Sequence, residues 1–506
     1  MNPNPSDADP ILCKPTSEPS PSASASASKC PVVPPLPPQL PPVPEGRCAS
    51  YQSLKKRYCK GRVLPNSLYC GNHKHLNFSS DLSISCPIGC GNVFLKSSLK
   101  SHLKKCNLAR MQKELEKQVY HSKGINLPKP SNPSSTSSSS PSFSPPTLNT
   151  LSSYTTLALL IQKLHFTLPS LPSTDLSLTP PLPSTSFLSQ KIPLGTQKHI
   201  LQIDSLTSNL LSTSIISQKT ESIIELGSGR GMLGLVVAGT LSSRFNKNVD
   251  LTFIERGTSR RQADKFSKRE RSEGEEGEGE VDLTKININR IRCDLSDVDM
   301  SRLPLKPETS NIAIAKHLCG AGTDIGLRAC LKLKGLKGVS FATCCHGVCS
   351  YDTFVGRAYM RKLFEREGGV FGEEVFNVIK KWTGASTADD SDKSVNRDRT
   401  KDKVDAKGEE VFEHNVVEEK NDGIPGAGLV CGDEKINFTK QELGRMCQRL
   451  IDYGRCVFVR EELGLEEGWG TYVAEEVSPQ NCWVWGRKRE EGGEGEEREV
   501  KKRKVE

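Results

Sequence analysis

Eight cysteine and histidine residues near the N-terminus constrain the fold of this 506-residue chain more than any other feature. The segment 47–123 around them has few large apolar side chains, so a hydrophobic core cannot stabilise it and it needs a cross-link. The eight residues form two sets of four, and four sulfur or nitrogen ligands are what a tetrahedral Zn²⁺ ion requires. We therefore predict two structural zinc modules, at residues 45–78 and 83–110. Their ligands are Cys48, Cys59, Cys70 and His73 in the first, and Cys86, Cys90, His102 and Cys106 in the second.

The spacing within each set favours one arrangement of ligands. In the first set the last two members, Cys70 and His73, have Cys-x-x-His spacing, and His75 is the alternative to His73. In the second set the last two members are four residues apart and share one face of a helix, while the first two come from a preceding turn. The alternative, incidental thiols, would leave the segment without a cross-link.

The same segment is strongly basic. Residues 47–123 contain 15 Lys and Arg against 3 Asp and Glu, a local charge of +12 that exceeds the +9 of the whole chain. Tyr51, Tyr58 and Tyr69 lie among these bases. A small basic module suits the phosphate backbone of a nucleic acid, and a solvated surface is the alternative.

Composition divides the rest of the chain and indicates its compartment. Neither an export signal nor an apolar stretch long enough for a membrane span is recognisable, so we expect an intracellular protein whose 18 cysteines are thiols. The C-terminal "VKKRKVE" is of nuclear-import type or a solvated tail, which leaves nucleus and cytoplasm open. We expect a disordered Pro/Ser-rich start (1–44), a region of mostly linker (127–190), charged insertions (about 268–282 and 385–425) and a charged tail (489–506).

Residues 191–488 contain strand-like runs that alternate with helix-like runs, which predicts an α/β domain with a mostly parallel, Rossmann-like sheet. Within it, "ELGSGRGMLG" follows a short apolar run and carries glycines at alternate positions, Gly227, Gly229 and Gly231. A dinucleotide fingerprint would instead read GxGxxG, with an acid about 20 residues on. The glycine spacing here and the acids that accompany it point to a different ligand.

Three acids accompany successive strands of this domain. Glu225 precedes the glycine turn, Glu255 ends the next strand-like run, and Asp294 lies near the end of the third. This pattern suits S-adenosylmethionine (SAM), which has no phosphate for carboxylates to repel. We expect Glu225 to face the methionine ammonium or its water shell, Glu255 to accept from the ribose hydroxyls, and Asp294 to meet the adenine amino group.

Two further motifs, "NIAIAKHLCGAGTD" and "GVSFATCCHGVC", end where α/β enzymes commonly place their chemistry. Lys316 and His346 are the candidate catalytic residues, because methyl transfer to a hydroxyl needs a base or a cation near the oxygen. Phosphate binding is the alternative role for Lys316. We interpret the remaining thiols of the second motif, Cys344, Cys345 and Cys349, as packing residues.

Together these motifs resemble the eukaryotic tRNA:m(4)X modification enzymes, over residues 47–123 and about 190–488. The resemblance rests on "CGNH", "HLKKCN", "ELGSGRGMLG", "KHLCGAGTD" and "CCHG", with "KHILQIDSL" and "LGRMCQRLIDYGR". It implies SAM-dependent 2′-O-methylation of the fourth nucleotide of the tRNA acceptor stem. It also implies that the zinc modules bind the acceptor stem and position it for methylation. The ribose 2′-hydroxyl would distinguish this substrate from DNA.

The chain departs from the family pattern at two positions. Asn92 stands where the family has the first histidine of its second finger, so Cys90 is the substitute ligand, and Gly347 replaces the second histidine of "CCHH". Two other functions remain open: an RNA-binding scaffold with a degenerate methyltransferase domain, and a SAM enzyme acting on protein or a small molecule. The intact glycine and glutamate set argues against the scaffold.

Overall fold

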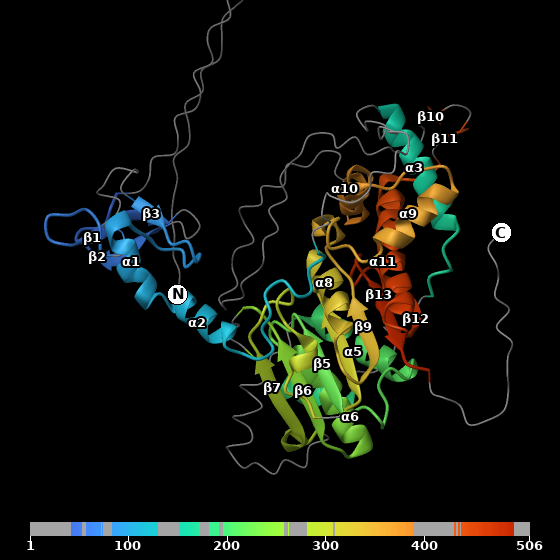
Figure 1. The fold of residues 1–506 in the computed structure, drawn as a ribbon, viewed down its shortest axis with the longest axis horizontal. Helices are drawn as coiled ribbons and strands as arrows, with labels where there is room; N and C mark the ends of the chain where they lie inside the picture. The colour runs from blue at the N-terminus through green and yellow to red at the C-terminus, as the bar shows by residue number, and fades with distance from the viewer. Residues whose placement is uncertain are drawn as a thin grey trace, which may run out of the picture. The chain divides into compact units, whose positions relative to one another are not determined.

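The structure, a computed structural model, describes most of the zinc-binding segment and of the α/β domain. Most of the segments expected to be disordered or charged fall outside the described residues. The described part divides into two compact units, the first ending at Ala109 and the second beginning at Arg110 (Figure 1). None of the helices in this part has the length and apolarity of a membrane span. The described residues are 42–52, 57–71, 73, 83–129, 151–172, 182–191, 196–257, 262, 281–306, 309–387, 430–431, 434–435 and 437–489.

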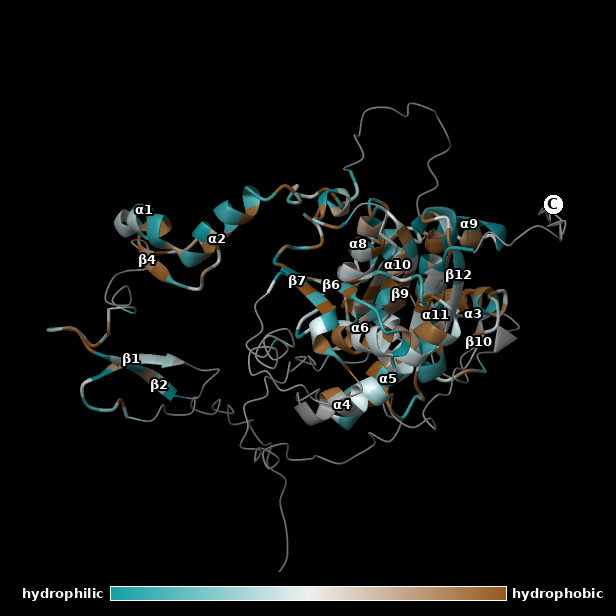
Figure 2. Ribbon diagram, turned by 90° about the horizontal axis from the view of Figure 1, so that it is seen from below, coloured by the Kyte–Doolittle hydropathy of each residue, from teal (hydrophilic) through white to brown (hydrophobic). Residues whose placement is uncertain are grey.

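The first unit consists of two short hairpins and a helix, with no apolar core among its described residues. Its only buried residues there are Cys48, Cys70, Cys86 and Cys106, and the helices present largely hydrophilic residues (Figure 2). The described part of the segment therefore has no apolar core, as its composition predicted. The elements are β1 (Arg47–Gln52) with β2 (Arg57–Arg62), β3 (Ser83–Ser85) with β4 (Val93–Leu95), α1 (Lys96–Lys105) and the start of α2 (Asn107–Glu116).

A seven-stranded sheet forms the centre of the second unit and confirms the predicted α/β class. Its spatial order is β12-β13-β9-β8-β5-β6-β7, in which β13 runs antiparallel to both of its neighbours and the remaining pairs are parallel. The strands are β5 (Ser222–Leu226), β6 (Val249–Ile254), β7 (Ile286–Ile291), β8 (Asn311–Lys316), β9 (Leu336–Ala342), β12 (Glu466–Thr471) and β13 (Cys482–Arg487).

Helices cover both faces of this sheet (Figure 1). Successive residues of a strand point to opposite faces, so Ile223 packs in the cluster on one face and Ile224 in the cluster on the other. The first face is covered by α4 (Pro183–Lys191), α5 (Gln197–Ser212) and α6 (Met232–Phe245), and the second by α8 (Ala321–Cys330) and the C-terminal half of α11 (Lys440–Glu461). The apolar runs of the sequence are therefore explained by burial on both sides of a largely parallel sheet.

A third apolar cluster contains helices at one end of α11. Leu157 and Ile161 of α3 (Leu151–Phe166) are buried there beside Trp382. This differs from the expectation that residues 127–190 are mostly linker, because α3 and α4 both carry buried side chains. The cluster also includes α9 (Arg357–Arg366) and α10 (Glu373–Trp382).

The other elements of the second unit are short. They are the 3₁₀ helices η4 (Leu283–Lys285), η5 (Met300–Arg302), η6 (His346–Val348) and η7 (Thr383–Thr387) and the strands β10 (Val430–Cys431) and β11 (Glu434–Lys435).

Residues 120–127 lie against the loop that follows β7. The buried Asn126 donates from Nδ2 to the carbonyl oxygens of Leu295 and Val298, at 2.8 and 2.7 Å, and Gly124 N donates to Asp297 Oδ1 at 2.8 Å. The α/β unit thus begins well before the predicted residue 191. The segment also braces the loop that carries Asp294.

The strand order reverses beside β5. From β5 the chain continues to β6 and β7 on one side, and then returns to place β8 and β9 on the other. In open α/β sheets the ligand crevice lies at such a switch point, outside the carboxyl ends of the strands. Here those ends carry the glycine turn after β5 and Lys316 at the end of β8.

Candidate functional site

The three glycines after β5 have left-handed backbones but different surroundings. A Cβ on Gly227 would lie 2.4 Å from Leu318 Cδ1, and one on Gly231, which precedes α6, would lie 2.7 Å from the Phe253 ring. Gly229, with a φ of +49°, would meet nothing within 4 Å. Packing therefore explains two of the glycines, while Gly229 leaves open space for a ligand to approach the backbone.

Glu255, directly after β6, holds this turn in place. Its Oε2 accepts from Gly229 N at 2.9 Å and its Oε1 from Gly257 N at 2.8 Å. Arg290 of β7 supports the same turn: its Nη1 donates to Gly229 O at 3.3 Å, and its guanidinium lies 4.5 Å from the Phe253 ring centre. Sequence reasoning missed Arg290, because a basic residue inside a strand carries no motif.

Glu225 lies beneath the turn and is 4% exposed. Its Oε2 accepts from Gly234 N in the first turn of α6, at 2.9 Å. Burial raises the pKa of Glu225 to about 8, although the Gly234 hydrogen bond and the charges of Arg290 and Lys316 oppose the shift. Glu225 was expected to face the methionine ammonium of SAM, and one of its two carboxylate oxygens is therefore already hydrogen-bonded to the protein backbone.

Asp294 follows β7 by three residues and is the most open of the three acids. Its side chain is 42% exposed, its Oδ1 accepts from Ser296 N at 2.9 Å, and Arg256 Nη1 lies 3.8 Å from its Oδ2. Glu225 is the last residue but one of β5, and Glu255 and Asp294 follow β6 and β7. Since these strands are parallel neighbours, the three acids lie at the same edge of the sheet. This is the arrangement expected from the sequence.

Lys316 and His346 follow neighbouring strands but lie in different surroundings. Lys316 pairs with Ala342 at the ends of β8 and β9, and burial lowers its pKa to about 8 against the opposing effects of Glu225 and Cys344. His346 is 1% exposed, and its Nε2 lies 2.8 Å from Asp452 Oδ2. Its Nδ1 is buried and makes no hydrogen bond to the described part of the chain.

The partner of His346 belongs to a buried ionic network. Asp452 also accepts from Thr343 and from Arg455, and Arg455 donates to both oxygens of Asp324 at 3.1 and 2.7 Å. Burial favours the neutral form of Asp452, but His346, Arg455 and Thr343 outweigh it and lower its pKa to about 2. Sequence reasoning missed this network, which joins residues more than 100 positions apart.

His346 also lines a pocket of about 290 Å³ beside α11. The pocket is lined by two arginines, Arg445 and Arg449, and by Gln480 and Asn481, and Lys316 is not among its lining residues. The two candidate catalytic residues therefore do not share this pocket. Other lining residues are Leu171, Gln448, Thr471, Val473, Ala474, Glu475, Pro479 and Cys482.

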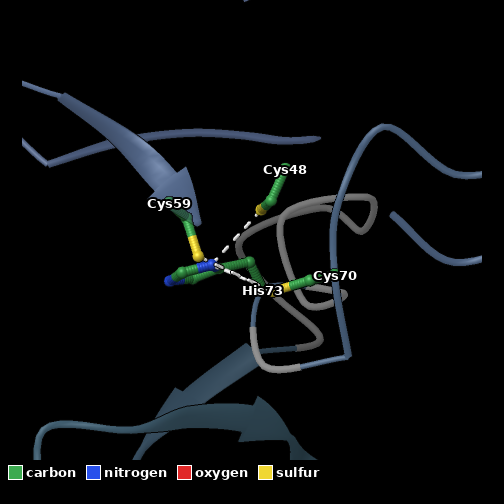
Figure 3. A group of neighbouring side chains, drawn as sticks. All are labelled: Cys48, Cys59, Cys70 and His73. Carbon is green, nitrogen blue, oxygen red and sulfur yellow. Dashed lines mark hydrogen bonds between the residues drawn. The ribbon is translucent and has the colours of Figure 1, made fainter. Parts of the chain in front are cut away.

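The first cysteine and histidine set converges as predicted. Figure 3 shows Cys48, Cys59, Cys70 and His73 directed toward a common point, and their ligand atoms lie within 4.8 Å of one another. His73 Nδ1 is 3.3 Å from Cys48 Sγ and 3.4 Å from Cys70 Sγ. These separations fit four ligands of one tetrahedral zinc ion. The alternative ligand, His75, lies outside the described residues.

The second set converges in the same way and uses Cys90. Its four ligand atoms also lie within 4.8 Å, and His102 Nε2 is 3.3 Å from Cys86 Sγ and 3.4 Å from Cys90 Sγ. Asn92, at the family's histidine position, instead donates to Cys90 Sγ at 3.3 Å. Cys106 caps α1 and does not lie within it, a small departure from the shared helix face that its spacing predicted.

Comparison with known proteins assigns a methyltransferase domain and a zinc finger to the same two parts of the chain. Residues 201–486 match the family described as Methyltransferase TRM13, and residues 46–74 match the CCCH zinc finger in TRM13 protein. A "tRNA:m(4)X modification enzyme TRM13" of Vanderwaltozyma polyspora is 26% identical over 433 residues, which cover 83% of this chain and 91% of that protein. The protein of the same name in Saccharomyces cerevisiae is 25% identical over 82% of this chain and 90% of its own length. The human "tRNA:m(4)X modification enzyme TRM13 homolog" is 23% identical over 83% and 90%.

Proposed function

The chain belongs to the TRM13 methyltransferase family, and from that membership and the site we propose that it methylates a ribose 2′-hydroxyl of tRNA with SAM as the methyl donor. We further propose nucleotide 4 of the acceptor stem as the target, because the chain is similar over more than 80% of its length to proteins named tRNA:m(4)X modification enzymes. The proposal rests mainly on the glycine turn at the switch point, with acids at the carboxyl ends of the three neighbouring strands β5, β6 and β7 and Lys316 at the end of β8.

The edge of the sheet fits SAM in three respects. The open space above Gly229 admits a ligand against the backbone. Each oxygen of Glu255 accepts one backbone hydrogen bond and retains a lone pair for a ribose hydroxyl. Asp294 is exposed enough to accept from an adenine amino group. SAM, when bound, supplies a methyl group on a positively charged sulfur.

The chain's own residues would handle the proton of the ribose hydroxyl. Lys316, with a pKa near 8, can stabilise negative charge on the 2′-oxygen as an ammonium or accept the proton as an amine. His346 is the second candidate, because Asp452 holds its Nε2 and leaves Nδ1 as the basic nitrogen. Lys316 is our first choice because it ends β8, at the switch point itself.

The zinc modules would bind the tRNA. Their segment carries a charge of +12, which favours phosphate contacts, and a 2′-hydroxyl target selects RNA over DNA. From the basic cluster at residues 500–506 we propose that the protein is located in the nucleus, the cytoplasm or both, with the nucleus favoured.

The test is transfer of a labelled methyl group from SAM to tRNA, followed by mapping of the methylated ribose. Gly229→Val should abolish transfer and SAM binding, because a branched side chain fills the open space. Gly464→Val is the matched control: Gly464 also has a left-handed backbone and open surroundings, but it lies after α11, and its variant should retain SAM binding.

Three outcomes would contradict the proposal. If tRNA binds but receives no label, the chain is an RNA-binding scaffold. Label that enters protein or a small molecule and is unaffected by removal of the zinc modules would assign a different acceptor. Equal SAM affinity in both glycine variants would place the cofactor elsewhere.

A further inference from the structure

Three cysteines outside the zinc modules meet at the carboxyl edge of the sheet. Cys319 Sγ lies 3.3 Å from Cys344 Sγ and 3.3 Å from Cys345 Sγ, and all three sulfurs lie within 4.8 Å of one another. Cys319 follows β8, whereas Cys344 and Cys345 follow β9, so two separate loops bring the thiols together. Each zinc module brings its ligands together within the same distance.

The backbone of both loops adopts unusual conformations around this cluster. His317 has a φ of +58° and Cys345 a φ of +38°, and both are non-glycine residues in the left-handed region. Gln480 Oε1 accepts from Cys345 N at 2.7 Å and helps to hold that conformation. Such strain persists where surrounding interactions over-determine it, and it occurs most often at functional sites.

Packing does not account for this arrangement. The buried thiols of Cys330 and Cys447 lie in helices and belong to no group of metal-ligand side chains among the described residues. Cys319, by contrast, is exposed, so apolar burial gives no reason for it to meet two other cysteines. The packing interpretation remains reasonable for Cys349, which is buried and lies 3.1 Å from Arg455 Nη2.

We propose that Cys319, Cys344 and Cys345 bind one soft divalent metal ion, with Zn²⁺ as the expected metal. Two thiolates bound to one zinc at about 2.3 Å lie roughly 3.8 Å apart. The two separations from Cys319 Sγ are 3.3 Å, so the thiols would move apart by roughly 0.5 Å to hold the ion. Three protein ligands leave a fourth position, which the exposure of Cys319 opens to water or an exogenous ligand. The ion would tie the end of β8 to the end of β9, three residues from Lys316. The proposal does not depend on tRNA being the substrate.

Metal analysis of the full-length protein tests it. After purification without chelator, zinc, iron and copper are measured per chain, and we expect three metal ions, of which two belong to the zinc modules. Cys319→Ala and Cys345→Ala should each reduce the total to two. The matched control is Cys330→Ala, a buried thiol of the same unit, which should leave three.

If a cysteine variant fails to fold, a second measurement on the wild-type protein still tests the proposal. Although Cys319 is exposed, a bound metal should protect it from alkylation until a strong chelator is added, as detected by mass spectrometry. The proposal is overturned if the wild type holds only two metal ions and Cys319 alkylates equally fast with and without chelator. A disulfide among the three thiols of the isolated, unreduced protein would overturn it as well.

Discussion

At the end of β8, Lys316 is held in surroundings that favour its neutral form. Burial lowers its pKa to about 8, while Glu225 and Cys344 favour the charged form. The charge of Lys316 in turn helps to lower the pKa of the next residue, His317. A lysine near this value can change protonation close to neutral pH, which an exposed lysine cannot. The residue therefore has the properties of a catalytic base as well as those of an electrostatic contact.

Substitution of Lys316 separates these roles. If the lysine is the base, Lys316→Ala should lower kcat by about 10²- to 10⁴-fold with little change in SAM or tRNA affinity, and Lys316→Arg should be almost as inactive. Wild-type kcat should rise with pH and level off above about 8, because only the deprotonated amine accepts a proton. If the lysine contacts phosphate, Lys316→Arg should instead keep full turnover at saturating tRNA. Steady-state kinetics from pH 6 to 10 distinguish the two.

Single residues were predictable where their chemistry is local in sequence. The zinc ligands converge as their spacing indicates, and Cys90 takes the place of the histidine that Asn92 replaces. Cys319 was not recognised as a partner of Cys344, because their contact depends on β8 and β9 being neighbours in the sheet. A thiol at the end of each of two neighbouring strands was the available signal.

At the scale of elements, the long helix α11 connects the candidate site to the core. Its first half packs in the cluster with α3 and α10, its second half covers the sheet, and Asp452 in its middle reaches His346. The strands of the sheet were predictable because apolar runs alternate with helices. The packing of α3 was not, because it follows a Ser/Pro-rich stretch and its burial depends on distant helices.

Asp452→Asn should destabilise the protein strongly. The change removes the charge that balances Arg455 and orients His346 in a buried network, and breaking such a pair costs about 3 kcal/mol. The lowered pKa of Asp452 stabilises the fold above the unfolded value of about 3.9, and that stability is lost as pH falls through about 2. The Asp452→Asn variant has no carboxyl group at this position, so its free energy of unfolding should lack this dependence on pH.

Chemical denaturation at several pH values measures the difference in the free energy of unfolding. Glu461→Gln, an exposed change on the same helix, is the control and should stay within about 0.5 kcal/mol of the wild type. An Asp452→Asn variant as stable as this control would show that the network contributes little.

At the scale of the whole molecule, the two units are stabilised by different physics. The α/β unit buries apolar side chains on both faces of a sheet, whereas the described part of the first unit buries only cysteines. Composition alone distinguished the two, because a basic segment poor in apolar residues cannot form a core. Their division at Ala109 and Arg110 lies close to the predicted end of the second zinc module.

Because folding and metal binding are one event in such modules, Cys59→Ser should unfold the first zinc module and leave the α/β unit intact. The variant should lose one metal ion per chain and bind tRNA roughly tenfold more weakly, with a shallower dependence of affinity on salt as phosphate contacts are lost. SAM affinity and the unfolding transition of the α/β unit should be unchanged. Filter binding at several salt concentrations, calorimetry with SAM and elemental analysis test these points together. Unchanged tRNA affinity despite loss of the metal would show that the first module does not hold the RNA, and would assign tRNA binding to the second module or to the α/β unit.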